Sequence, residues 1–145
     1  VKEIPKAELQ EQSQRLIDRV FPPFDHDQPD TDNNKERFRD FLKVEITPDV
    51  TNLYCFDDAI GIDADYMFAF NCNKATSNRI IETHQLKVDK GNSGNAFGLQ
   101  HDFEWWDKPR IKNLKKFSWT NGKGYHKYYW YDHENEKAYF FDFSM

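Results

Sequence analysis

The side chains that come closest in type and spacing to a reactive centre are His101, Asp102 and Glu104, which follow a glycine-rich loop. An imidazole and two carboxylates can bind a divalent cation or exchange protons with a substrate, as in a metal-dependent hydrolase. The sequence identifies no further ligand, and no two of the five histidines have the His-Glu-x-x-His spacing that places two ligands on one helix face. Surface polar residues are therefore the favoured interpretation, and no cofactor is expected.

The acidic loop from Asp25 to Asp32 resembles the beginning of a calcium-binding loop. Aligned on Asp30, it supplies carboxylate and amide oxygens at the first three ligand positions. A calcium loop also needs a glycine and a closing bidentate glutamate, and the sequence has Lys35 and Phe41 at those positions. We therefore expect a solvated loop that caps the following helix.

Other catalytic signatures are missing from the sequence. Neither Cys55 nor Cys72 lies in a neighbourhood that would activate a thiolate, and the chain contains no Gly-x-Ser-x-Gly elbow. The glycines Gly91, Gly94 and Gly98 match neither the dinucleotide fingerprint nor the phosphate loop. We therefore expect a protein that is not an enzyme.

The two cysteines lie in segments that we expect to form neighbouring strands. If Tyr54 lies near Asn73 in a hairpin, Cys55 and Cys72 can form a disulfide. The alternative is that both are small core residues. The chain begins at Val1, which we interpret as the removal of a preceding segment. These features favour an exported protein of the periplasm or cell envelope, where disulfides persist.

The charge of the chain is unevenly distributed. Residues 108–127 contain seven basic side chains and no acidic one, so the remaining 13 basic and 25 acidic residues carry a net charge of −12. An acidic body of this kind would associate quickly with a basic protein. The aromatic residues of the basic segment also suit single-stranded nucleic acid, but the acidic total makes that partner unlikely. The remaining alternative is surface charge without a binding role.

The region from Tyr125 to Met145 is unusually aromatic, and its two aromatic runs are separated by polar residues 132–137. This pattern predicts a β-hairpin. If Tyr131 pairs with Ala138, one face is large and apolar and should be core. Its members are Tyr128, Trp130, Tyr139, Phe141 and Phe143, whereas Tyr129, Tyr131, Ala138, Phe140 and Asp142 lie on the opposite face.

The tyrosine face of this hairpin is a candidate binding surface. Tyrosine combines a large contact area with a polar tip and is enriched at interfaces. We therefore expect Trp105, Trp106, Tyr129 and Tyr131 to bind a partner. The alternative is that helices cover this face and make it a second core.

The elements that position these residues follow from the periodicity of the sequence. It predicts an amphipathic helix over residues 6–21 and a second over 34–43, capped by Asn33 and Glu36. Strands are expected over 50–56, with Val50, Tyr54 and Phe56 on one face, and over 66–72. A short helix over 76–84, a short strand at 86–88 and a helix with Asp107 at its cap and Pro109 in its first turn follow.

The order of these elements predicts one α+β domain over residues 1–145. Its N-terminal helices would pack on one face of an antiparallel sheet that ends in a three-stranded aromatic meander. No apolar run reaches the length of a membrane span.

Three segments resemble a pattern in small bacterial proteins of uncharacterised function. They are Trp105-Trp106-Asp107-Lys108-Pro109, Tyr129-Trp130-Tyr131-Asp132 and Ala138-Tyr139-Phe140, within roughly residues 101–145. Some of those proteins are exported lipoproteins, and others are immunity-type proteins encoded near toxins. The resemblance implies a non-catalytic protein that engages a protein partner, for which a basic toxin is one concrete form. The alternatives are a small-ligand-binding domain with an aromatic pocket and the hydrolase considered above.

Overall fold

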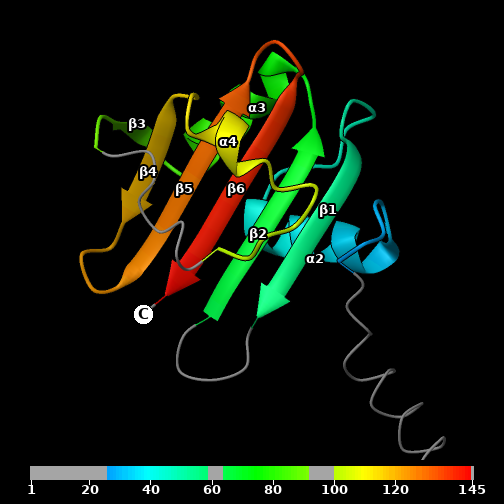
Figure 1. The fold of residues 1–145 in the computed structure, drawn as a ribbon, viewed down its shortest axis with the longest axis horizontal. Helices are drawn as coiled ribbons and strands as arrows, with labels where there is room; N and C mark the ends of the chain where they lie inside the picture. The colour runs from blue at the N-terminus through cyan, green and yellow to red at the C-terminus, as the bar shows by residue number, and fades with distance from the viewer. Residues whose placement is uncertain (1–25, 59–63, 92–99, 145) are drawn as a thin grey trace, which may run out of the picture.

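Six strands of the chain form one antiparallel sheet (Figure 1). The computed structural model describes residues 26–58, 64–91 and 100–144. The strands are β1 (Thr51–Asp58), β2 (Ala64–Asn71), β3 (Lys87–Asp89), β4 (Lys116–Thr120), β5 (Tyr125–Asp132) and β6 (Lys137–Ser144), and the helices are α2 (Asp32–Leu42), α3 (Lys74–Thr83) and α4 (Lys108–Ile111). The predicted α+β class is confirmed. The helix predicted over residues 6–21 lies outside the described residues.

The strands follow the order β1-β2-β6-β5-β4-β3 in the sheet. β5 and β6 form the predicted hairpin, and Tyr131 lies opposite Ala138, which is the register on which the assignment of its two faces depends. β4 pairs with β5 and completes the predicted meander. The other edge of β6 pairs with β2 along the whole of Ala64 to Asn71. The last strand of the sequence therefore lies in the interior of the sheet.

Both faces of the sheet are covered. On one face, Phe38 of α2 and Ile80 of α3 belong to the same core as Phe140 of β6. On the other face, Trp106 and Ile111 pack against the sheet from the segment that contains α4. Figure 1 shows α4 in front of the sheet and α2 and α3 behind it. The sheet is therefore the middle layer of the protein, with a separate core on each side.

The tyrosine face of the β5–β6 hairpin is the core beneath α2 and α3. Tyr129 has 0% of its surface exposed and Tyr131 has 6%. The Tyr129 hydroxyl shares a hydrogen bond of 2.8 Å with Ser77, and the Tyr131 hydroxyl donates to the Cys72 carbonyl at 2.7 Å. Helices therefore cover this face and make it a second core, which is the alternative interpretation of the sequence, and the hydroxyls are satisfied within the protein.

An irregularity in β1 changes the faces on which its side chains lie. The register with β2 shifts between Thr51 and Tyr54, and Asn52 has a left-handed backbone with φ of 50°. Val50 packs under α2, whereas Tyr54 and Phe56 pack on the opposite face. The prediction that these three residues share a face is wrong, because a bulge breaks the alternation on which it rests.

The same pairing keeps the two cysteines apart. Cys55 lies opposite Phe68, and Tyr54 lies opposite Ala69 rather than near Asn73. Both cysteines are buried and free, so the predicted disulfide is wrong. Burial raises the pKa of the Cys72 thiol to about 12, and that of Cys55 is raised further. Their place in the core beside Phe68 and Phe70 is the alternative interpretation of the sequence.

The acidic loop uses its polar groups to bind the edge strand β1. The Asp30 carboxylate accepts from the Leu53 amide at 2.9 Å, and the Asn34 side chain donates to the Leu53 carbonyl at 2.8 Å. Thr31 caps α2 by accepting from the Asn34 amide, so the predicted cap at Asn33 is wrong. The loop is therefore structural, and it satisfies backbone groups that an edge strand would otherwise expose.

His84 is buried at the end of α3 with 4% of its surface exposed. Its Nε2 donates to the Leu42 carbonyl at 2.6 Å, and its Nδ1 lies 3.1 Å from the Lys127 ammonium. Desolvation lowers the pKa of His84 to about 4, and the positive charges of Lys127 and Lys43 act in the same direction. His84 is therefore neutral in the folded protein at neutral pH.

Replacing Tyr129 with alanine should destabilise the fold strongly. We expect the Tyr129→Ala change to lower the free energy of unfolding by about 3–5 kcal/mol, because it leaves a cavity under α3. The matched Tyr129→Phe change removes only the hydrogen bond to Ser77 and should lower it by about 1 kcal/mol. Urea unfolding measures both values. Small and equal effects of the two changes would contradict the assignment of this face to the core.

The stability of the protein should depend on the protonation of His84. The pKa of His84 is lower in the folded than in the unfolded chain, so its contribution is complete above about pH 6.5 and is lost as the pH falls towards 4. We expect a loss on the order of 3 kcal/mol across this interval. In the His84→Gln protein, urea midpoints should fall less between these pH values. An unchanged pH profile in this variant would contradict the prediction.

Candidate functional site

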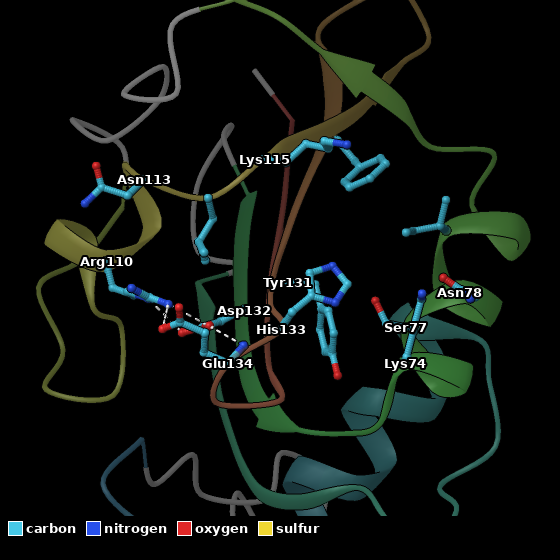
Figure 2. A pocket seen from close by; sticks show the side chains of 13 residues that line it. Lys74, Ser77, Asn78, Arg110, Asn113, Lys115, Tyr131, Asp132, His133 and Glu134 are labelled. Carbon is cyan, nitrogen blue, oxygen red and sulfur yellow. Dashed lines mark hydrogen bonds and ion pairs between the residues drawn. The ribbon is translucent and has the colours of Figure 1, made fainter.

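A cleft lies between α3 and the segment that contains α4, beside the end of β5 (Figure 2). Its volume is about 540 Å³. The lining residues are Lys74, Ser77, Asn78, Ile81, Arg110, Asn113, Leu114, Lys115, Phe117, Tyr131, Asp132, His133 and Glu134. The cleft therefore collects side chains from distant parts of the sequence, and most of its rim is polar.

One wall of the cleft is built around Arg110. Asp107 caps α4 by accepting from the Arg110 amide, as predicted, and Pro109 lies in the first turn. The Arg110 guanidinium donates to both oxygens of Asp132 at 2.8 and 2.9 Å, and to Glu134 at 3.0 Å. Arg110 also holds the pKa of Asp132 well below its usual range. This bidentate geometry connects α4 to the β5–β6 turn and fixes the wall in place.

The opposite wall is one face of α3. Lys74, Ser77, Asn78 and Ile81 have the spacing of residues that share a helix face. Asn73 caps this helix by accepting from the Thr76 amide at 2.9 Å. The wall therefore begins at a helix end whose position is set by its cap.

The cap of α3 is held in turn by Asp49. The Asp49 carboxylate accepts from the Asn73 amide at 3.0 Å and from the Thr76 hydroxyl at 2.8 Å. Burial raises the pKa of Asp49, but hydrogen bonds from Thr47, Asn73 and Thr76 outweigh this effect and lower the pKa to about 2. The start of the helix is thereby connected to the turn before β1.

The floor of the cleft is apolar. It is formed by parts of Tyr131, Phe117 and Leu114, and the rings of His133 and Tyr131 pack in a T-shaped arrangement with their centroids 4.8 Å apart. Figure 2 shows His133 over Tyr131 in the middle of the cleft. A ligand in this position would meet hydrocarbon below it and polar groups around it.

Of the four residues predicted to bind a partner, only Tyr131 lines this cleft. Trp105 and Trp106 are 7% and 3% exposed, and they belong to the core opposite Tyr129. The Trp105 indole donates to the His26 carbonyl at 2.8 Å, and the Trp106 indole donates to the Gln100 side chain at 2.6 Å. These side chains hold the outer layer on the sheet, and their binding role stays a prediction.

The predicted acid–base cluster is dispersed in the structure. His101 lies 3.4 Å from the Asp65 carboxylate, and Asp102 lies 2.7 Å from the Lys108 ammonium, which lowers the pKa of Asp102. Glu104 lines a separate depression beside Trp105. Across residues 26–58, 64–91 and 100–144, no group of three or more His, Cys, Asp or Glu side chains could hold a metal ion.

The residues that form the walls of the cleft are not among the site residues predicted from the sequence. The local signal for α3 predicts the helix, and the spacing of Lys74, Asn78 and Ile81 shows that they share a face. Nothing local connects that face to Arg110, nor Arg110 to Asp132, which is 22 positions further along the chain. Only the strand order brings these groups together.

Comparison with known families, curated proteins and solved structures finds no match for this chain. The resemblance to exported lipoproteins and immunity-type proteins therefore stays a prediction. Within the described residues, no helix is long and apolar enough to span a membrane. The geometry of the cleft is therefore the feature of the molecule that bears most directly on function.

Removing Asp132 should loosen the Arg110 wall. We expect Asp132→Ala to lower the free energy of unfolding by about 2 kcal/mol, because it removes the buried carboxylate that accepts hydrogen bonds from the side chains of Arg110 and Asn135. In the matched control Glu134→Gln, the carboxylate lost is 80% exposed, and the change should stay below about 0.5 kcal/mol. Urea unfolding measures the difference. Equal effects of the two changes would show that the bidentate pair does not hold the wall.

Proposed function

We propose that this is a non-catalytic binding protein that engages a protein partner through the cleft between α3 and α4. The cleft is the observation that carries the proposal. Its volume of about 540 Å³ lies within the range of ligand-binding sites. Its walls are held by the Arg110–Asp132 pair and by the capped start of α3. Walls that are ordered before binding reduce the entropy lost on association.

The contacts within the cleft support binding rather than catalysis. The Ser77 hydroxyl is occupied by the Tyr129 hydroxyl at 2.8 Å, and the Asp132 carboxylate is occupied by Arg110. A nucleophile needs a general base within hydrogen-bond reach, and neither group is arranged in that way. Both act as parts of the framework.

Immunity to a bacterial toxin, in the periplasm or cell envelope, is one concrete form of the proposal. Its support is the resemblance of the segments at Trp105, Tyr129 and Ala138 to immunity-type proteins. Lys74 and Lys115 on the rim of the cleft favour an acidic segment of such a partner at this place, whereas the acidic remainder of the chain would attract its basic surface.

A small-ligand-binding domain is the second candidate. The floor of Tyr131, Phe117 and Leu114 favours it, since small-molecule sites combine an apolar lining with a few polar groups. In this case the aromatic pocket expected from the sequence would be the cleft itself.

Panning a random peptide display library on the purified protein tests the proposal. Selected peptides should bind the wild-type protein, and the Asn78→Trp change should weaken binding by about ten-fold or more, because an indole at this exposed rim position fills the opening. The control Ala75→Trp places the same side chain on the exposed surface of α3 outside the cleft lining. Calorimetry measures the affinities, and urea midpoints verify folding. Peptides that bind the Asn78→Trp protein undiminished would refute the cleft as the binding site.

A further inference from the structure

Two lysines that line the cleft, Lys74 and Lys115, have no negatively charged partner among the described residues. Lys74 begins α3, and Lys115 precedes β4, so the two side chains come from different sides of the cleft (Figure 2). Both are exposed. Within the part of the chain that the structure describes, neither makes an ion pair or hydrogen bond. Their charges are therefore available to a ligand.

The third cation of the cleft is already neutralised. Arg110 donates to the carboxylates of Asp132 and Glu134, so its fork is occupied by two negative charges. A guanidinium fork is the usual partner for bidentate recognition of a carboxylate or a phosphate, and the fork of Arg110 is not available to a ligand. The two lysines are point charges instead, so they can attract an anionic group without bidentate geometry.

The other residues that line the cleft indicate the chemistry of the rest of the ligand. The amide side chain of Asn78 lies on the rim and can donate or accept a hydrogen bond. Below the rim, Tyr131, Phe117 and Leu114 offer an apolar surface. A ligand that fits both the polar rim and the apolar surface below it has an apolar body with a negative group at its outer end.

We propose that the cleft binds a carboxylate attached to an apolar body, with Lys74 and Lys115 as the residues that recognise the charge. This inference rests on the proposed function, because it names the chemistry that the same cleft recognises. Two sources can supply such a group. One is an acidic side chain next to an aromatic or aliphatic residue of a partner protein, and the other is a free organic acid.

Phenylacetate and its neutral analogue phenylacetamide form the first test. Titration of the ¹⁵N-labelled protein with phenylacetate should shift the amide signals of Asn78, Lys115 and His133, with a dissociation constant on the order of 1 mM. Phenylacetamide should bind at least about five-fold more weakly, because it lacks the charge. Equal binding of the two compounds, or no binding of either, would overturn the carboxylate assignment. Displacement of phenylacetate by inorganic phosphate at constant ionic strength would also overturn it.

Variants that each lack one positive charge test whether Lys74 and Lys115 bind the carboxylate. Lys74→Gln and Lys115→Gln should each weaken phenylacetate binding by about five-fold. Lys123→Gln removes the same charge at an exposed position outside the cleft lining and should have no effect. A loss of the same size in all three proteins would assign the effect to net charge and would contradict the specific role of the two lysines.

Capped dipeptides distinguish the two sources and separate this inference from the proposed function. If the partner is a protein, N-acetyl-Phe-Glu-amide should bind more tightly than phenylacetate and than N-acetyl-Phe-Gln-amide. If phenylacetate binds more tightly than the acidic dipeptide, the source is a free organic acid. Peptides selected by display that occupy the cleft without any acidic residue would refute the carboxylate recognition while leaving the proposed function intact. Peptides insensitive to Asn78→Trp would refute the proposed function itself.

Discussion

The fold depends on the pairing of β5 with β6 in the register that places Tyr131 opposite Ala138. Aromatic side chains occupy both faces of this hairpin, and a sheet whose two faces are both apolar must be covered on both sides. α2 and α3 meet this requirement on one side, and the segment around Trp106 and α4 meets it on the other. The cleft is a consequence, because it lies where α3 and α4, which cover opposite faces, flank the end of the same strand.

Much of the fold was predictable because its signals are local. The two aromatic runs and the polar residues between them predicted the hairpin of the last two strands, and Asp107 followed by Pro109 predicted the start of α4. The prediction for β1 failed because one residue changed the register in which this strand pairs with β2. The register of β1 shifts by one residue beside the left-handed backbone at Asn52, so Tyr54 lies on the face opposite that of Val50. A single-residue slip of this kind has no clear signature in the sequence.

The candidate site was harder to predict than the fold. The basic segment was evident, but its lysines are distributed over both faces and the rim of the sheet. Lys116 is buried beside Asp89 and over the Tyr128 ring, and Lys127 lies over Trp119, whereas Lys115 lines the cleft. The order of the strands in the sheet determines which residue each of these lysines contacts. The tyrosines of the last two strands make the composition unusual, but Tyr129 and Tyr131 contribute mainly to the core.

The position of β6 has a consequence for the order in which the protein can fold. β6 is the last strand of the sequence, yet it lies between β2 and β5 and joins the two halves of the sheet. During synthesis the strands β1 and β2 therefore cannot join the strands β3 to β5 in one sheet until β6 has left the ribosome. Its pairing with β2 joins distant parts of the chain, which makes closure of the sheet a slow step. The nascent chain therefore passes through a stage in which its edges need protection from other chains.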